Sequence, residues 1–195
     1  MQQIEIIFRE ILYQRMELKR NMFTQAQLAA SFHVSLSTVN RAIRILADMG
    51  AVEIHLRSFS ILDVKKVLYY WASIRNLQKD CIYATRVEQP VKEIEKAMPD
   101  DIIFGAYSAY KFLFHDVPAD YSEVYVYADL ETIKKRFPPQ KHVPNLFVLK
   151  TDDSIQKYGK KTTYAQTFVD LWNIREWYAK EFVTAFEVRF HGILE

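Results

Sequence analysis

Apolar side chains recur at helical spacing through the first fifty residues, in three separate segments. Residues 2–18 carry the first apolar stripe, and residues 25–32 carry a second, shorter one. A third segment begins at Ser35 or Ser37, either of which can cap a helix. It ends at Gly50, the residue type that most easily adopts the positive φ found after a helix C-terminus. The pattern predicts three helices joined by short turns.

The following stretch changes from helical to alternating spacing. "AVEIHLRSFSILD", residues 51–63, holds two short alternating runs around Arg57, which predicts a β-hairpin. Three helices followed by a hairpin is the order of elements in a winged helix-turn-helix domain. Helical spacing then resumes over residues 63–79. This helix joins the two halves, packs on the first domain or forms a dimer seam, and the pattern leaves these alternatives open.

The rest of the chain alternates between strand-like and helix-like segments. We expect strands at residues 81–87, 123–129 and 145–150, and helices at residues 90–98, 106–116, 130–137 and 173–190. Within residues 124–127 the valines fall on one face of the strand and the tyrosines on the other. The fold class expected is α+β, in which an N-terminal winged helix-turn-helix is followed by a small α/β domain with a mixed sheet.

The third helix has two distinct faces when its residues are advanced by about 100° each. One face gathers apolar side chains, namely Val39, Ala42, Ile43, Leu46 and Met49. The opposite face gathers polar ones, namely Ser37, Arg41, Arg44 and Asp48, with Asn40 near its border. The polar side chains are therefore expected to point away from the core.

Such a polar face suits a helix in the major groove of DNA. Arginine can bond bidentately to guanine, asparagine can do so to adenine, and hydroxyl groups at the helix start can bond phosphate or base. An arginine at the hairpin tip can reach the flanking backbone. The residues expected to contact DNA are Ser35, Ser37, Thr38, Asn40, Arg41, Arg44 and Arg57. An ordinary amphipathic surface helix would also place its arginines outside, so the order of elements carries more weight than the arginines alone.

"LAASFHVSLSTVNRAIRIL", residues 28–46, resembles the helix-turn-helix signature of bacterial and archaeal regulators. In that pattern a small residue, here Ala29, permits close crossing of the two helices. A glycine is usual in the turn, where this chain has His33, and histidine tolerates left-handed backbone geometry better than most residues. The resemblance extends over about residues 5–62. It implies a DNA-binding regulator, although some winged domains bind protein instead.

The second half resembles, more loosely, the C-terminal domain of AbiE-type antitoxins and related regulators (the AbiEi family). The stretches that carry this likeness are "FGAYSAYKFLFHD", "SEVYVYAD" and "TTYAQTFVDLWN". The resemblance implies a repressor of its own toxin–antitoxin or phage-defence operon. It also implies a nucleotidyltransferase-like toxin as a protein partner.

Composition and charge narrow the class of protein. A single cysteine, Cys81, excludes an internal disulfide, and no run of about 18 apolar residues or basic leader is present, so we expect a cytoplasmic protein without membrane contact. Residues 1–62 hold seven basic and five acidic side chains, whereas residues 63–195 hold nineteen of each. The small positive excess of +2 therefore lies in the N-terminal part. This positive charge is too sparse for a protein that coats nucleic acid without sequence preference.

The residues that could form an enzyme active site support catalysis less well than the N-terminal pattern supports DNA binding. Gly105, Ser108, Asp129 and Glu131 imitate the Gly-Ser and carboxylate set of a nucleotidyltransferase, but Asp129 is more simply the cap of the helix that follows it. The histidines are dispersed, and Cys81 has no histidine nearby in sequence, so a metal site or a nucleophile is not expected. The lysines of residues 157–161 suit a solvated loop better than a phosphate site.

Together these patterns predict a non-enzymatic, sequence-specific regulator with three parts. They are a DNA-binding domain at residues 1–62, a linker helix at 63–79 and an α+β domain at 80–195, which is antitoxin-like or a degenerate nucleotidyltransferase. The partners expected are double-stranded DNA, a second copy of the chain in a homodimer, and a toxin protein. No cofactor and no metal is expected. An antitoxin-type interaction module and an active nucleotidyltransferase-like enzyme remain the alternatives.

Overall fold

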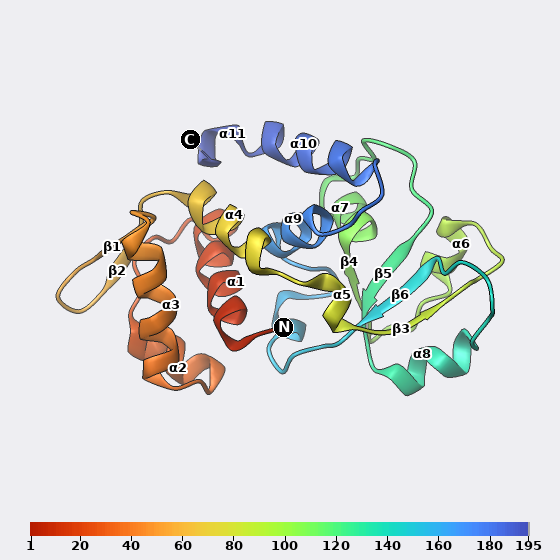
Figure 1. Cartoon of the computed structure of the whole chain (residues 1–195), viewed down its shortest axis with the longest axis horizontal. Coiled ribbons are helices and arrows are strands. Elements are labelled where there is room, and N and C mark those ends of the chain that lie inside the picture. Colours follow the sequence, from red (N-terminus) through yellow and green to blue (C-terminus); the bar gives the residue numbers. More distant parts are fainter. Residues whose placement is uncertain (195) are drawn as a thin grey trace. The chain divides into compact units, whose positions relative to one another are not determined.

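The computed structural model describes residues 1–194, and these form two compact units. One unit comprises residues 1–75 together with residues 187–194, and the other comprises residues 76–186 (Figure 1). In this division most of the segment 63–79, together with residues 187–194, groups with the N-terminal unit.

The N-terminal unit has the predicted order of three helices and a hairpin (Figure 1). Its elements are α1 (Gln3–Met16), α2 (Gln25–Phe32), α3 (Leu36–Asp48), β1 (Val52–Ile54), β2 (Phe59–Ile61), α4 (Val64–Ile74) and α11 (His191–Leu194). Local caps define the helix starts: the hydroxyl of Thr24 accepts a hydrogen bond from Gln27 N, and that of Ser35 accepts one from Thr38 N. After α3, Gly50 has the expected positive φ of 67°. An N-terminal helix-turn-helix region is therefore present.

The hairpin formed by β1 and β2, hereafter the wing, is held at its base by the loop that precedes α2. Phe23 and Phe59 exchange backbone hydrogen bonds of 3.0 and 2.9 Å, and their rings stack with centroids 5.2 Å apart. The side-chain amide of Asn21 donates to the carbonyl of Ile61 and accepts from its N–H. The wing is thus tied to the loop before α2 as well as paired within itself.

The core of this unit lies where α1 packs against α3 and α4. Ile7, Phe8 and Ile11 of α1 are fully buried there. The core also contains a polar group of three side chains, because buried Glu5 lies beside Trp71 and Arg75 of the α4 end. Buried charges require partners, and here Arg75 lies 3.5 Å from Glu5.

The C-terminal unit is built around a four-stranded mixed sheet in the order β3-β6-β5-β4 (Figure 1). β5 and β6 are parallel and the other neighbours are antiparallel. Its strands are β3 (Cys81–Thr85), β4 (Ile103–Gly105), β5 (Val124–Tyr127) and β6 (Leu146–Leu149). Its helices are α5 (Leu77–Asp80), α6 (Val91–Lys96), α7 (Ala106–Phe114), α8 (Leu130–Arg136), the short 3-10 helix η1 (Ile155–Tyr158), α9 (Tyr164–Trp172) and α10 (Ala179–Arg189). The last three residues of α10 group with the N-terminal unit. The expected α+β class with a small mixed sheet is confirmed.

Each face of this sheet has its own core. Val124 and Val126 pack with Ile94 of α6 and Ile133 of α8 on one face. On the other face Tyr127 is fully buried, and its hydroxyl donates to Asp170 of α9 at 2.6 Å. The valines of β5 therefore face one side of the sheet and its tyrosines face the other, as the sequence predicts.

Several boundaries differ from the sequence prediction. The helix expected over residues 63–79 is interrupted at Arg75, and Asn76 then caps the separate α5 by accepting a hydrogen bond from Lys79 N. The helix expected over residues 173–190 begins only at Ala179. Strand β4 and helices α9 and α11 were not predicted as separate elements, because each is short or lies within a longer apolar run.

Candidate nucleic-acid interface

Helix α3 has the two faces that its sequence predicts. Val39, Ala42, Ile43 and Leu46 are all fully buried, whereas Met49 is only half-buried. The opposite side exposes Ser37, Arg41, Arg44 and Asp48 to solvent. One side of α3 is thus fixed to the core, and the other offers two guanidinium groups and a hydroxyl to a ligand.

Three other expected contact residues already bond within the protein. The hydroxyl groups of Ser35 and Thr38 lie 2.8 Å apart and cap α3 together. The Asn40 amide, half-buried, donates to Gln25 of α2 at 3.2 Å. Ser35 and Thr38 thus cap α3, whereas Asn40 ties α3 to α2. Base contact by Asn40 therefore requires that its bond to Gln25 be shared or exchanged.

The turn between α2 and α3 depends on His33. Its backbone is left-handed, with φ 52° and ψ 36°, at the position where the motif usually has glycine. The following residue, Val34, donates its N–H to the carbonyl of Ala29 at 3.1 Å. Histidine therefore supports the sharp change of direction that brings α3 across α2.

Arg57 lies at the tip of the wing. The tip is closed by a hydrogen bond of 2.8 Å from His55 N to the carbonyl of Ser58, so Leu56 and Arg57 form its end. Leu56 is 97% exposed, and Arg57 is also exposed. The wing thus projects one cationic and one apolar side chain beyond the core.

Two further cations, Lys65 and Lys66 in the first turn of α4, were not predicted from the sequence. Both are exposed, and the Lys66 ammonium lies next to Gly50 at the end of α3, where a Cβ atom on the glycine would be 3.8 Å from the Lys66 nitrogen. They lie just beyond residue 62, the boundary assigned to the DNA-binding domain. The signal in the sequence is the pair of adjacent lysines in the first turn after Asp63, the N-cap of α4.

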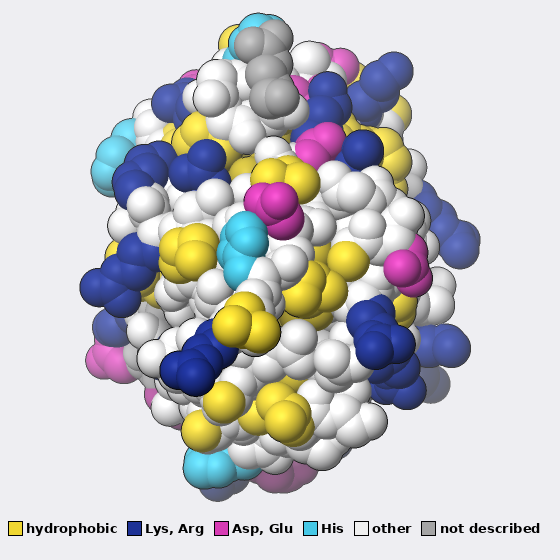
Figure 2. Space-filling model, turned by 90° about the vertical axis from the view of Figure 1, so that its left-hand side faces the viewer, with side chains coloured by type: hydrophobic (Ala, Val, Ile, Leu, Met, Phe, Trp, Pro, Cys, Tyr) yellow, Lys and Arg dark blue, Asp and Glu magenta, His cyan; other side chains and the backbone are white. Residues whose placement is uncertain are grey.

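Figure 2 views the molecule from the side that carries α2, α3 and the wing. Lys and Arg side chains occur there in separate groups, with hydrophobic side chains between them and few acidic ones. The acidic residues of these elements include Asp48 on α3 and Glu53 on the wing, both exposed. The surface is therefore mildly cationic with apolar areas, and such a mixture suits contacts to both phosphates and base edges.

The nucleotidyltransferase-like set in the C-terminal unit is not assembled for phosphate binding. Ser108 is fully buried in α7, and Gly105 packs so closely that a Cβ atom there would be 3.1 Å from the Tyr127 ring. Asp129 is exposed and caps α8, because its carboxylate accepts a hydrogen bond from Thr132 N at 3.1 Å. That bond holds the pKa of Asp129 below its usual value. Glu131, in the first turn of α8, lies near Lys134 at 3.9 Å.

The remaining candidate groups have structural surroundings. Burial raises the pKa of the half-buried Cys81 thiol, which is the reverse of nucleophile activation. Lys160 lies 3.3 Å from Asp100, and the Lys161 ammonium donates to the carbonyl of Phe112 at 2.7 Å. Over residues 1–194 no group of three or more His, Cys, Asp and Glu side chains is arranged to hold a metal ion.

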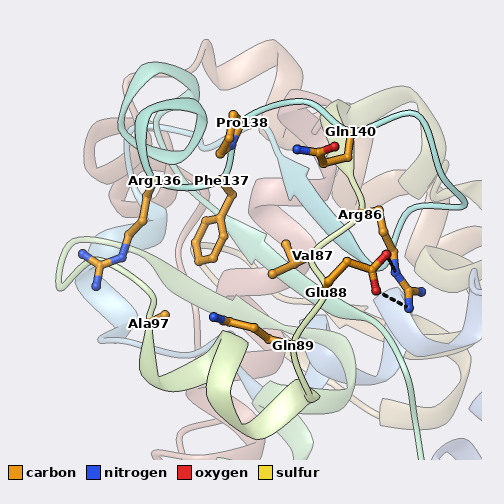
Figure 3. Close-up of a pocket in the computed structure, with 9 residues that line it drawn as sticks. All are labelled: Arg86, Val87, Glu88, Gln89, Ala97, Arg136, Phe137, Pro138 and Gln140. Carbon is orange, nitrogen blue, oxygen red and sulfur yellow. Dashed lines mark hydrogen bonds and ion pairs between the residues drawn. The ribbon is translucent and has the colours of Figure 1, made fainter.

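A hollow of about 460 Å³ lies between β3, α6 and the end of α8 (Figure 3). Val87 and Phe137 provide its apolar surface, and Arg136 lies at its edge (Figure 3). The other arginine of the hollow, Arg86, is paired with Glu88 at 3.2 Å. Because that pairing neutralises the charge of Arg86, we assign no ligand to this hollow.

In the part of the chain that the structure describes, none of the helices combines the length and the apolar character needed to cross a bilayer. The family model described as "HTH domain" matches residues 9–58, which run from within α1 to the wing. No curated protein matches the chain, and no solved structure matches it. The matched segment contains α2, the turn at His33 and α3, so the N-terminal unit carries a helix-turn-helix domain of the DNA-binding class.

Proposed function

We propose that this chain is a sequence-specific transcription regulator that represses its own operon. The observation that carries the proposal is the exposed face of α3, on which Arg41 and Arg44 stand opposite a fully buried apolar face. The match to the helix-turn-helix family over the same residues supports DNA as the partner.

In this proposal α3 lies in the major groove. Arg41 and Arg44 then reach base edges, and each bidentate bond to a guanine contributes about 1–3 kcal/mol of discrimination. Ser35, Ser37 and Thr38, at the N-terminus of α3, face the phosphates, where exposed N–H groups favour negative charge. Arg57 reaches the backbone or minor groove beside the site, and Asn40 contacts a base after exchange of its bond to Gln25.

We further propose that the chain acts as a dimer on a two-fold symmetric site. A single α3 offers few base contacts, and two copies multiply them when their half-sites lie about 10 base pairs apart on one side of the duplex. We further propose the expected division of roles, in which residues 1–62 provide the main contacts to DNA, residues 63–79 connect, and residues 80–195 carry contacts other than those to DNA. Lys66, at the start of the connecting segment, adds a phosphate contact to those of residues 1–62.

The test is a gel-shift titration of the whole chain on the DNA upstream of its own gene. The Arg41→Ala, Arg44→Ala double variant should lose specific binding and keep its circular dichroism spectrum and its melting temperature. The matched control is Lys135→Ala, Arg136→Ala on α8, which removes the same charge from two exposed residues of the other unit. Equal loss in both double variants, or unchanged affinity in the first, would contradict the proposal.

A second candidate function is direct neutralisation of a nucleotidyltransferase-like toxin. Trp172 and Trp177 are 46% and 76% exposed, and they line one shallow cavity of about 460 Å³ with Val183. Exposed tryptophans in a cavity are frequent anchors of protein interfaces. Co-expression with the product of the adjacent gene, followed by co-purification, tests this candidate, and Trp177→Ala should weaken the complex without affecting DNA binding.

A further inference from the structure

The sheet face that carries Tyr125 is covered over only part of its width. A row of paired residues runs across the four strands, from Ala84 through Phe147 and Tyr125 to Gly105. Helices α7 and α9 pack over the end of this row at β4. At the other end Ala84 is exposed and Phe147 is half-buried. The part of this face formed by β6 and β3 is therefore open to a ligand.

A cavity of about 310 Å³ occupies this open part of the sheet. Its floor includes Tyr125 and Phe147, and its walls include Leu77 of α5 and Ile174 and Glu176 of the segment between α9 and α10. Its volume is at the lower end of the range for small-molecule sites, which are commonly apolar with a few polar groups. The cavity thus has the size for a small organic molecule.

The floor of the cavity is aromatic. The rings of Tyr125 and Phe147 are nearly parallel, with an interplanar angle of 11° and centroids 4.7 Å apart. The face of an aromatic ring carries partial negative charge and attracts cations, most strongly where water is excluded. Tyr125 is only 8% exposed and is stacked on Phe147, so the half-buried Phe147 supplies the ring face that a ligand can reach.

Two carboxylates lie at the same end of the unit. Glu176 lines the cavity, and Glu123, directly before β5, accepts a hydrogen bond from the Tyr178 hydroxyl. Burial raises the pKa of Glu123, and the nearby charge of Glu176 raises it further. Both carboxylates also raise the pKa of Tyr125, after the larger effect of burial.

Neither of these two acids is paired with a basic side chain of the described residues. Within residues 1–194 neither Glu123 nor Glu176 forms an ion pair with a lysine or an arginine. Arg175 also lines the cavity, but its side chain is exposed. The aromatic floor and the acidic wall therefore favour positive charge and disfavour an anion.

We infer that this cavity binds a small organic cation, in which a primary or quaternary ammonium group is carried on an apolar body. The ammonium group lies against Glu176 and the face of the Phe147 ring, and the body contacts Leu77 and Ile174. A bare metal ion suits the site poorly, because a set of three or more ligating side chains is absent from the described residues. Such binding is independent of the proposed contact with DNA.

The test is isothermal titration calorimetry of the whole chain with probes that differ in charge. Phenethylamine and choline are the ammonium probes, N-acetylphenethylamine is the neutral analogue, and 3-phenylpropionate is the anion. At least one ammonium probe should bind with a dissociation constant near or below about 1 mM. The neutral and anionic analogues should bind at least about tenfold more weakly. Failure of both ammonium probes to bind, or equal affinity for the anion, would overturn the inference.

Two variants locate the site. Glu176→Gln should weaken ammonium binding about tenfold, whereas Glu181→Gln, which removes an exposed charge from α10, should leave it unchanged. Phe147→Leu should also weaken binding, since the ring face is lost while apolar volume is kept. Melting temperatures confirm that each variant is folded. Equal affinities in Glu176→Gln and Glu181→Gln would show that any binding observed is not at this cavity, and would equally overturn the inference.

Discussion

Glu5 in α1 accepts a hydrogen bond of 3.0 Å from the indole N–H of Trp71 in α4. The same carboxylate oxygen lies 3.5 Å from the Arg75 guanidinium, and the other oxygen accepts the N–H of Gln2 at the start of α1. One buried acid therefore caps the first helix and joins it to the fourth. This explains an acidic residue inside an otherwise apolar helix face.

Glu5→Ala should destabilise the N-terminal unit by about 3 kcal/mol, because it removes one partner of a buried ion pair. Glu5→Gln should cost less, since an amide oxygen can still accept from Trp71. Urea unfolding followed by tryptophan fluorescence measures both changes. The exposed Glu53→Ala serves as the control and should change the free energy of unfolding by less than about 0.5 kcal/mol. Equal effects at Glu5 and Glu53 would contradict a structural role for the buried acid.

Lys66→Ala should weaken DNA binding to all sequences alike, because an ammonium beside the end of α3 is placed for phosphate rather than base contact. The slope of log affinity against log salt should fall in magnitude by about 0.9 for each phosphate that is no longer neutralised. Gel-shift titrations at several salt concentrations provide the slope. Arg44→Ala, by contrast, should reduce the preference for the specific site over random DNA. Identical behaviour of the two variants would refute the assignment of Lys66 to phosphate contact and Arg44 to base contact.

Gly105→Ala should destabilise the C-terminal unit by about 1–3 kcal/mol, because the new Cβ would be 3.1 Å from the ring of fully buried Tyr127. The Tyr127 ring cannot move freely, since its hydroxyl is bonded to Asp170. Gly192→Ala in α11 is the matched control, as a Cβ added there would have no atom within 4 Å and alanine favours a helix. Thermal unfolding should show a lower melting temperature for the first variant only.

Glu123→Gln should stabilise the protein at neutral pH. The pKa of Glu123 is raised in the folded state, so the folded protein binds this proton more readily than the unfolded chain does. The charged carboxylate therefore costs stability at neutral pH, and this cost disappears as pH falls below the ordinary value of 4.5. Glutamine imitates the protonated acid and can still accept from Tyr178, so the advantage of the variant should vanish in acid.

The control for Glu123 is Asp129, a carboxylate whose pKa is shifted in the opposite direction. Asp129 has a lowered pKa because it accepts hydrogen bonds from Thr132, so its charge stabilises the folded state above the ordinary value of 3.8. Asp129→Asn should therefore destabilise the protein at neutral pH, with a smaller effect in acid. Unfolding curves over a pH series measure both variants. A parallel pH dependence of the two would be inconsistent with the assigned environments.

The sequence predicts the N-terminal unit closely because its signals are local. Thr24 and Ser35 cap helices through their own neighbours, and the buried face of α3 follows from residue spacing alone. The bond from Asn40 to Gln25 could not be predicted in this way, since it depends on how α2 and α3 cross. The position of Lys66 beside Gly50 cannot be predicted for the same reason, because it is set by tertiary packing.

The C-terminal unit is less predictable because its elements are short and depend on pairing. β4 has three residues and is defined by its pairing with β5. The apolar periodicity of residues 173–190 continues through Ile174 and Tyr178, although the helix begins only at Ala179. The cavity over Tyr125 and Phe147 combines residues from strands that are neighbours only in the folded sheet.

The anchoring of β2 by Asn21 and Phe23 has a consequence for how a duplex is distinguished. Because the base of the hairpin is bonded to the segment leading into α2, we expect the wing and α3 to keep a nearly constant separation. In the proposed complex, DNA whose groove width and backbone path match that separation would contact both elements without deformation. Base pairs that no side chain touches would thereby influence affinity through the stiffness and shape of the helix they form.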